Sequence, residues 1–261
     1  GSAAASCAPL QDLLKEITAQ TPRDGGSGGG AAAAASASAG GAAALKEEGN
    51  KFYKAGSYGE AIKLYTRAIA ADPEAGACYG NRAACWLMLE KRERCIADCA
   101  EALRRDPSLH KVRARMATAC TQLGKMERAA DILAEGVALG GEHAAALGAQ
   151  LATTRELGTA LTVARAAFDE GAFSRAKREA QKLLVAGVAD ENVHLLLAKA
   201  HLALKEAVEA ARAAQKAIAI DADCLAAYLV RAEALHAMGL SDKAIKRMWQ
   251  QFRPASDHYL I

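Results

Sequence analysis

Residues 79–107, YGNRAACWLMLEKRERCIADCAEALRRDP, decide the fold, because their small residues and their proline recur at a fixed distance along the chain. Within this stretch the small residues are Ala83, Cys95 and Ala102, and Pro107 closes it. The same pattern stands 34 residues away, at Gly49 and Ala117, Ala61 and Ala129, Ala68 and Gly136, and Pro73. This period predicts units of two antiparallel helices, in which small residues allow close packing and the proline ends the second helix.

A second series of small residues follows, out of register with the first. Ala176, Ala210 and Ala244 are again 34 residues apart, whereas the distance from Ala129 to Ala176 is one repeat plus 13 residues. Gly171 and Gly239 match each other, but Lys205 stands midway between them. We therefore expect an all-α solenoid with repeats 1–3 at 42–143, a connecting helix at 144–156, repeats 4–6 at 157–252 and a tail at 253–261.

The first 41 residues have a different composition. Residues 1–22 contain one short amphipathic stretch with Leu10, Leu13, Leu14 and Ile17 on one side, which we interpret as an unanchored or self-docking helix. Its L-x-x-L-L string is typical of docking helices, but it is common by chance. Residues 23–41 are rich in Gly, Ala and Ser and predict a flexible linker. Because the chain begins with Gly1 rather than Met, we expect it to be part of a longer protein.

Composition argues against several classes of function. The net charge is +3 with acids and bases interspersed, so nothing indicates binding to nucleic acid or to a membrane surface. The sequence has no signal peptide and no apolar run of about 20 residues, and we expect a cytoplasmic location, with the nucleus as a second one. The seven cysteines form no C-x-x-C pair, so we expect small buried residues, and no catalytic, metal or cofactor motif is present. We expect no enzyme activity.

The first three A helices, the leading helices of repeats 1–3, place polar residues on one face. The three sets are Lys46, Asn50 and Tyr53; Asn81, Ala84 and Met88; and Lys111, Arg115 and Thr118. Within each set the spacing is three or four residues and then about seven, so each set shares a helical face. Stacked repeats would therefore gather three cations and two carboxamides around one groove, from which Glu47 and Glu48 should point away.

The repeat pattern resembles the tetratricopeptide repeat (TPR), with its period of 34, its small residues, an aromatic at Phe52 and Trp86, and the closing prolines. The resemblance covers most of residues 42–252 and is most specific in the first two units. The groove resembles the dicarboxylate clamp of TPR co-chaperones, whose five positions are here Lys46, Asn50, Asn81, Lys111 and Arg115.

The clamp resemblance implies a partner, namely the C-terminal Glu-Glu-Val-Asp tail of cytosolic heat-shock chaperones of the 70 and 90 kDa classes. It implies that Lys46, Asn50 and Asn81 hold the terminal carboxylate. Lys111 would take the Asp side chain and Arg115 an upstream acceptor. Tyr53, Ala84 and Met88 would form an apolar subsite. The string YGNRAACWLML is similar to the TPR arrays of J-domain co-chaperones, and the heat-shock organising protein is a comparable relative. The chain has no His-Pro-Asp tripeptide, so it carries no J activity.

The second group of repeats should not clamp a chaperone tail. Its equivalent positions hold Leu161, Arg165, Leu196, Ala226 and Val230. Its concave face is more apolar, with Leu161, Leu196, His201 and Tyr228, and is open to three interpretations: a surface for a helix or a client segment, a surface for a neighbouring part of the chain, or scaffold packing. Two alternative functions therefore stay open, a scaffold or assembly factor whose second array does the main work, and the regulatory arm of a larger enzyme.

Overall fold

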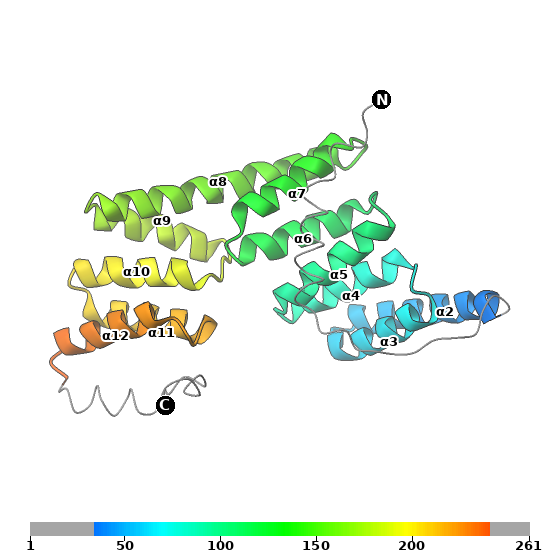
Figure 1. Cartoon of the computed structure of the whole chain (residues 1–261), viewed down its shortest axis with the longest axis horizontal. Coiled ribbons are helices and arrows are strands. Elements are labelled where there is room, and N and C mark those ends of the chain that lie inside the picture. The colour runs from blue at the N-terminus through cyan, green and yellow to red at the C-terminus, as the bar shows by residue number, and fades with distance from the viewer. Residues whose placement is uncertain (1–33, 241–261) are drawn as a thin grey trace, which may run out of the picture. The chain divides into compact units, whose positions relative to one another are not determined.

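The computed structural model describes residues 34–240, with side chains from Gly41 onward, and every regular element in that range is a helix (Figure 1). In chain order the helices are α2 (Ala34–Lys54), α3 (Tyr58–Ala71), α4 (Gly76–Met88), α5 (Arg92–Arg105), α6 (His110–Gln122), α7 (Met126–Ala138), α8 (Ala144–Asp169), α9 (Phe173–Val185), α10 (Glu191–Ala203), α11 (Ala207–Ile220) and α12 (Leu225–Ala237). The all-α prediction is confirmed. No described helix is both long enough and apolar enough to cross a membrane.

The chain forms two compact units, and the division falls inside α8, between Thr154 and Arg155. In the first unit α2 packs on α3, α3 on α4 and α4 on α5, so consecutive helices form hairpins (Figure 1). In the second unit α10 packs against α9, α11 and α12 in the same way. The predicted amphipathic stretch in 1–22, residues 23–33 of the predicted linker, Ala244 and the tail lie outside the described residues.

Two helix boundaries differ from the sequence-based expectation. Helix α2 begins at Ala34, so residues 34–41, which were expected in the linker, are helical. Alanine has the highest helix propensity, so an alanine-rich stretch can extend a helix that packing stabilises further on. Residues 144–156 are helical as expected but form the first half of the 26-residue helix α8, which runs on into the fourth repeat.

The recurring small residues lie in the tightest helix contacts, as predicted. Ala61, Cys95 and Ala129 have no exposed surface, and neither has the equivalent pair Ala68 and Ala102. The prolines follow the ends of α3 and α5 by two residues, after aspartates in extended conformation. The 34-residue period is therefore a packing period, in which each small residue marks a close approach of two helices.

Gly49 makes room for the ring of Tyr65 on α3. A Cβ atom added at Gly49 would lie 2.7 Å from Cε1 of Tyr65, closer than carbon atoms approach without displacement. Tyr65 is 1 % exposed, so its ring cannot easily move aside. Gly49 therefore weakens helix α2 locally but permits the α2–α3 contact of the first repeat.

Replacing Gly49 with Ala is expected to lower the free energy of unfolding by about 1–3 kcal/mol, the usual cost of overpacking a core. Gly59 provides the matched control, because it lies in helix α3 and a Cβ atom there would meet no atom within 4 Å. The Gly59→Ala variant is expected to gain up to about 1 kcal/mol from helix propensity. Urea denaturation of both variants checks the prediction, which fails if the two substitutions change stability equally.

The turns between the two helices of a repeat share one backbone conformation. Their positive-φ residues are Gly56, Glu90, Gly124, Gly171, Lys205 and Gly239, with φ between 58° and 78°. Each series of three has the spacing of 34 residues. Lys205, which interrupts the glycine pattern in the sequence, therefore adopts the same turn as its glycine counterparts, at the cost of a left-handed conformation.

Replacing Lys205 with Gly is expected to stabilise the second unit by about 1 kcal/mol, because glycine adopts positive φ without the Cβ clash. The reverse change, Gly171→Ala, is expected to destabilise it by a similar amount, since a Cβ atom there meets no other atom and only the backbone conformation is affected. Equilibrium denaturation followed by circular dichroism measures both shifts. Shifts of the same sign would contradict the explanation.

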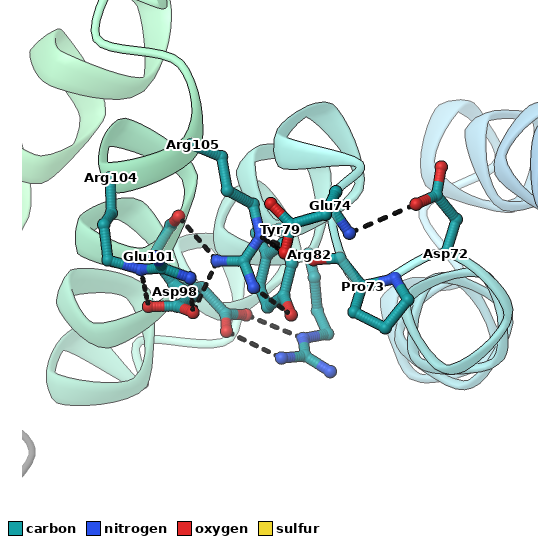
Figure 2. A network of polar contacts seen from close by, with 9 residues as sticks. All are labelled: Asp72, Pro73, Glu74, Tyr79, Arg82, Asp98, Glu101, Arg104 and Arg105. Atoms are coloured by element: carbon teal, nitrogen blue, oxygen red, sulfur yellow. Dashed lines mark hydrogen bonds and ion pairs between the residues drawn. The ribbon is translucent and has the colours of Figure 1, made fainter. Parts of the chain in front are cut away.

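A network of polar contacts joins α4, α5 and the turn before α4 (Figure 2). Arg105, whose side chain is 7 % exposed, donates to the carbonyl of Pro73 and to Glu101, and its Nη2 donates to Tyr79 Oη at 3.1 Å. In the next repeat a different residue has this role. Arg113 donates to the carbonyl of Pro107 at 3.2 Å and to Glu135 at 3.1 Å.

These two arginines occupy different repeat positions. Arg105 belongs to the second helix of its repeat, whereas Arg113 lies on the first helix, at the position that Tyr79 has in the preceding repeat. Their acceptors are equivalent, because Pro73 and Pro107, like Glu101 and Glu135, are 34 residues apart. One guanidinium therefore fixes each inter-repeat turn, and the fold accepts it from either helix.

Candidate functional site

Three helices of the first unit carry the predicted groove residues. Lys46 and Asn50 lie on α2, Asn81 on α4, and Lys111 and Arg115 on α6. The structure directly joins two of them, since Nδ2 of Asn81 donates a hydrogen bond to Oδ1 of Asn50 at 3.0 Å. The two carboxamides, 31 residues apart in sequence, therefore lie side by side.

Asn50 is fixed from two sides. Its Oδ1 accepts the bond from Asn81 and a second bond from Oη of Tyr65, at 2.7 Å. Because both bonds use the carbonyl oxygen, the amide group of Asn50 is left with its two N–H donors available. Asn81 likewise has one N–H donor that is not committed to Asn50. The pair thus presents N–H donors in a fixed orientation, as recognition of an anionic oxygen requires.

The cations differ in how they are held. Nη1 of Arg115 donates to the carbonyl of Gly80 at 2.6 Å, which places the guanidinium beside the turn of α4 that carries Asn81. Most of its five N–H donors stay available. Lys111 is exposed and has no ion-pair partner among the described residues. It stands one turn before Arg115, so both side chains lie on the same face of α6.

Lys46 has a neighbour that the sequence reasoning placed elsewhere. Its Nζ lies 3.7 Å from Oε1 of Glu47, although Glu47 was expected to point away from the groove. The side chain of Glu47 is 66 % exposed, so this ion pair is a loose surface contact. Such pairs contribute little to stability, so Lys46 is free to exchange Glu47 for a ligand carboxylate.

The predicted apolar subsite is only partly apolar surface. Tyr53 is half-buried, and its ring lies 5.5 Å from that of Tyr58. Ala84 is buried, so it contributes shape rather than contact area, whereas Met88 is 52 % exposed. The structure prints no contact among these three side chains, and their common subsite stays a prediction.

The cysteines beneath the groove are structural, as expected. Cys78, Cys85, Cys95, Cys99 and Cys120 are all buried with free thiols. Burial raises the pKa of Cys85 to about 11, against the opposing effect of Arg115, and burial likewise raises the pKa of Cys120 to about 11. These thiols are protonated at neutral pH and are poor nucleophiles. No group of three metal-ligating side chains is present in residues 34–240.

Sequence reasoning missed the residues that orient the site. Tyr65 orients Asn50, yet its equivalent one repeat later is Cys99, so the repeat gave no signal for it. The carbonyl of Gly80 positions Arg115 and leaves no side-chain pattern. Gln150 bonds to the third A helix from outside the repeat register. Only contacts between distant parts of the chain reveal these roles.

The second unit lacks the clamp side chains and differs from the predicted apolar face. His201 is 7 % exposed, and its Nδ1 contacts Oε2 of Glu206, whose carboxylate also binds Nζ of Lys177 at 2.8 Å. His201 therefore belongs to an internal polar network and not to an open concave surface. Leu161 is 9 % exposed, so it too is mainly a packing residue.

The first unit also has a cavity of about 510 Å³ away from the groove. It lies between the turn before α6 and the turn before α8, where the rings of His110 and His143 stack with centroids 3.2 Å apart. Arg113, which lines it, is already bonded to Glu135 and to a backbone carbonyl. The cavity contains none of the predicted site residues.

Comparison with solved structures decides the family. The TPR domain of P58(IPK) has a TM-score of 0.72 with 20 % identity over 84 % of this chain and 61 % of that one, which shows the fold. The second TPR domain of Spaghetti (RPAP3), bound to the HSP90 peptide SRMEEVD, is 40 % identical, with 38 % of this chain and 91 % of that chain covered and a TM-score of 0.37. The chain belongs to the tetratricopeptide-repeat family. Its 34-residue units are TPR motifs, as the sequence pattern indicated.

Curated relatives match only a part of the TPR chain. The Hsp70/Hsp90 co-chaperone CNS1 of Saccharomyces cerevisiae is 39 % identical over 89 residues, which is 33 % of this chain and 23 % of the relative. The chain spans less than a quarter of the length of the first curated relatives that it matches. No family model matches the chain.

Proposed function

We propose that the first TPR group is an adaptor site for peptides that end in a free carboxylate, namely the Glu-Glu-Val-Asp tails of the 70 and 90 kDa heat-shock chaperones. The observation that carries the proposal is the Asn50–Asn81 pair, whose free N–H donors are oriented by Tyr65. The co-chaperone name of a relative that is 39 % identical supports the same partner class.

Each clamp residue has a role that follows from its chemistry. The carboxamides of Asn50 and Asn81 donate to the terminal carboxylate, and Lys46 neutralises its charge after releasing Glu47. Lys111 pairs with the Asp side chain, since it is exposed and has no other partner among the described residues. Arg115 offers its remaining N–H donors to an acceptor further upstream. Hydrogen bonds to charged groups contribute about 1.5–3 kcal/mol each.

The order of the charges also matters. A tail with its carboxylates scattered in another order has the same net charge but cannot place one carboxylate at the asparagines and another at Lys111. Specificity therefore rests on geometry, whereas the overall attraction is electrostatic and weakens with added salt.

A titration with fluorescently labelled peptides tests the proposal. The free acid Glu-Glu-Val-Asp should bind, and the scrambled Val-Glu-Asp-Glu, of equal charge, should bind at least tenfold more weakly. Raising the salt from 50 to 500 mM should weaken the specific peptide further. Equal binding of both peptides would reduce the site to an unspecific basic patch and overturn the proposal.

A further inference from the structure

The first three turns of α8 complete the first TPR group. Leu147 and Leu151 are buried, and a Cβ atom at Gly136 of α7 would lie 2.7 Å from Cδ1 of Leu147. Gly136 has the same repeat position as Ala68 and Ala102. Leu147 thus packs at the small-residue position of the third repeat, so this part of α8 has a fixed place beside α6 and α7.

Gln150 connects this part of α8 to the helix that carries Lys111 and Arg115. Its Nε2 donates to Oγ1 of Thr118 at 3.0 Å and to the carbonyl oxygen of Ala114 at 3.1 Å. Both N–H donors of the amide are therefore in use, and the orientation of the side chain is fixed. Its Oε1 accepts no hydrogen bond from any described residue.

Gln150 lies beyond the clamp along the expected course of a bound peptide. Thr118, its partner, follows Arg115 by three residues and Lys111 by seven on the same helical face. Seven residues of helix span about 10 Å, which equals about three residues of extended peptide. A peptide whose last residue is held at Lys111 and whose upstream part passes Arg115 therefore reaches Gln150 just before its four terminal residues.

We propose that Gln150 is a specificity-determining residue that accepts a hydrogen bond from a main-chain N–H of the bound peptide, upstream of its four terminal residues. The inference rests on the proposed function. A fixed acceptor next to Thr118, whose hydroxyl proton is already donated to the carbonyl of Ala114, offers this end of the groove its uncommitted side-chain acceptor. The site therefore reads the presence of an extended chain before the clamp, independently of side chains there.

Isothermal titration of two peptides tests the inference. Acetylated Glu-Glu-Val-Asp and acetylated Ala-Ala-Ala-Glu-Glu-Val-Asp differ only in upstream backbone and methyl groups. The longer peptide is expected to bind wild-type protein about fivefold more tightly, the gain from one net hydrogen bond. Gln150→Leu should remove this gain and leave binding of the tetrapeptide unchanged. Thr153→Val, at an exposed neighbour on α8, should keep it.

A second measurement avoids dependence on the folding of the variant. In the longer peptide, N-methylation of one main-chain N–H upstream should cost the whole gain in wild-type protein, and methylation of the others should not. Equal affinity of wild-type protein for both peptides, or loss of tetrapeptide binding in Gln150→Leu without loss of the length effect, would overturn the inference. Absence of tetrapeptide binding to the wild-type protein would overturn the proposed function itself, and this inference with it.

Discussion

Replacing Lys111 with Glu is expected to weaken binding of the Glu-Glu-Val-Asp tail at least 100-fold without changing thermal stability. The change removes one charge-assisted contact, at about 1.5–3 kcal/mol, and places a like charge against the Asp side chain. Together these effects exceed the roughly 2.7 kcal/mol that a 100-fold change requires. Lys111 is exposed and bonded to no acid among the described residues, so the fold should not notice the change.

Lys51→Glu is the matched control for Lys111→Glu. Lys51 is exposed on α2, the helix that carries Lys46 and Asn50, but lies off the groove face. The same charge reversal there should weaken binding only slightly, through the long-range field. Isothermal titration and thermal melts of both variants separate the two effects. Equal losses in both variants would mean that net charge, and not the clamp, attracts the peptide.

Replacing Asp98 with Ala is expected to lower the free energy of unfolding by roughly 3 kcal/mol, because it leaves a buried guanidinium without its partner. Oδ1 and Oδ2 of Asp98 each accept a bond from Arg82 at 2.7 Å, and Oδ2 also accepts one from Nε1 of Trp86 at 3.0 Å (Figure 2). The side chain of Arg82 is only 18 % exposed, so water cannot fully replace Asp98.

The control for Asp98 is an ion pair of the same network that faces solvent. Arg104 pairs with Glu101 at 3.1 Å, and its side chain is 50 % exposed (Figure 2). Arg104→Ala should leave the unfolding curve almost unchanged, because water solvates the exposed carboxylate. Chemical denaturation monitored by the fluorescence of Trp86 measures both variants. A small effect of Asp98→Ala would show that the α4–α5 contact depends on apolar packing alone.

The fold was largely predictable because its packing repeats. Gly49, Ala61 and Ala68 each mark one close helix contact, and their recurrence every 34 residues locates six more. The continuity of α8 could not be predicted in this way. Thirteen residues out of register specify a helix, but whether that helix stops before the fourth repeat depends on packing and not on period. Lys205 shows the same limit, since a tertiary turn overrides its preference for negative φ.

For the candidate site, the sequence predicts which residues share a face but not how their side chains are held. Spacing along each helix places Lys111 beside Arg115, because helix geometry is regular. The bond from Tyr65 to Asn50 and the contact between Lys46 and Glu47 depend on side-chain rotamers and on neighbours from other helices. Whether the five clamp residues act together is a question that binding measurements answer.

The central claim is that the Asn50–Asn81 pair and Lys46 recognise a terminal main-chain carboxylate. Isothermal titration of Ala-Ala-Ala-Glu-Glu-Val-Asp as the free acid and as the C-terminal amide tests it directly, because the two peptides differ at that one group. We expect the free acid to bind at least tenfold more tightly, and the difference to vanish in the Asn50→Ala variant. Equal affinity of the wild-type protein for acid and amide would contradict the account.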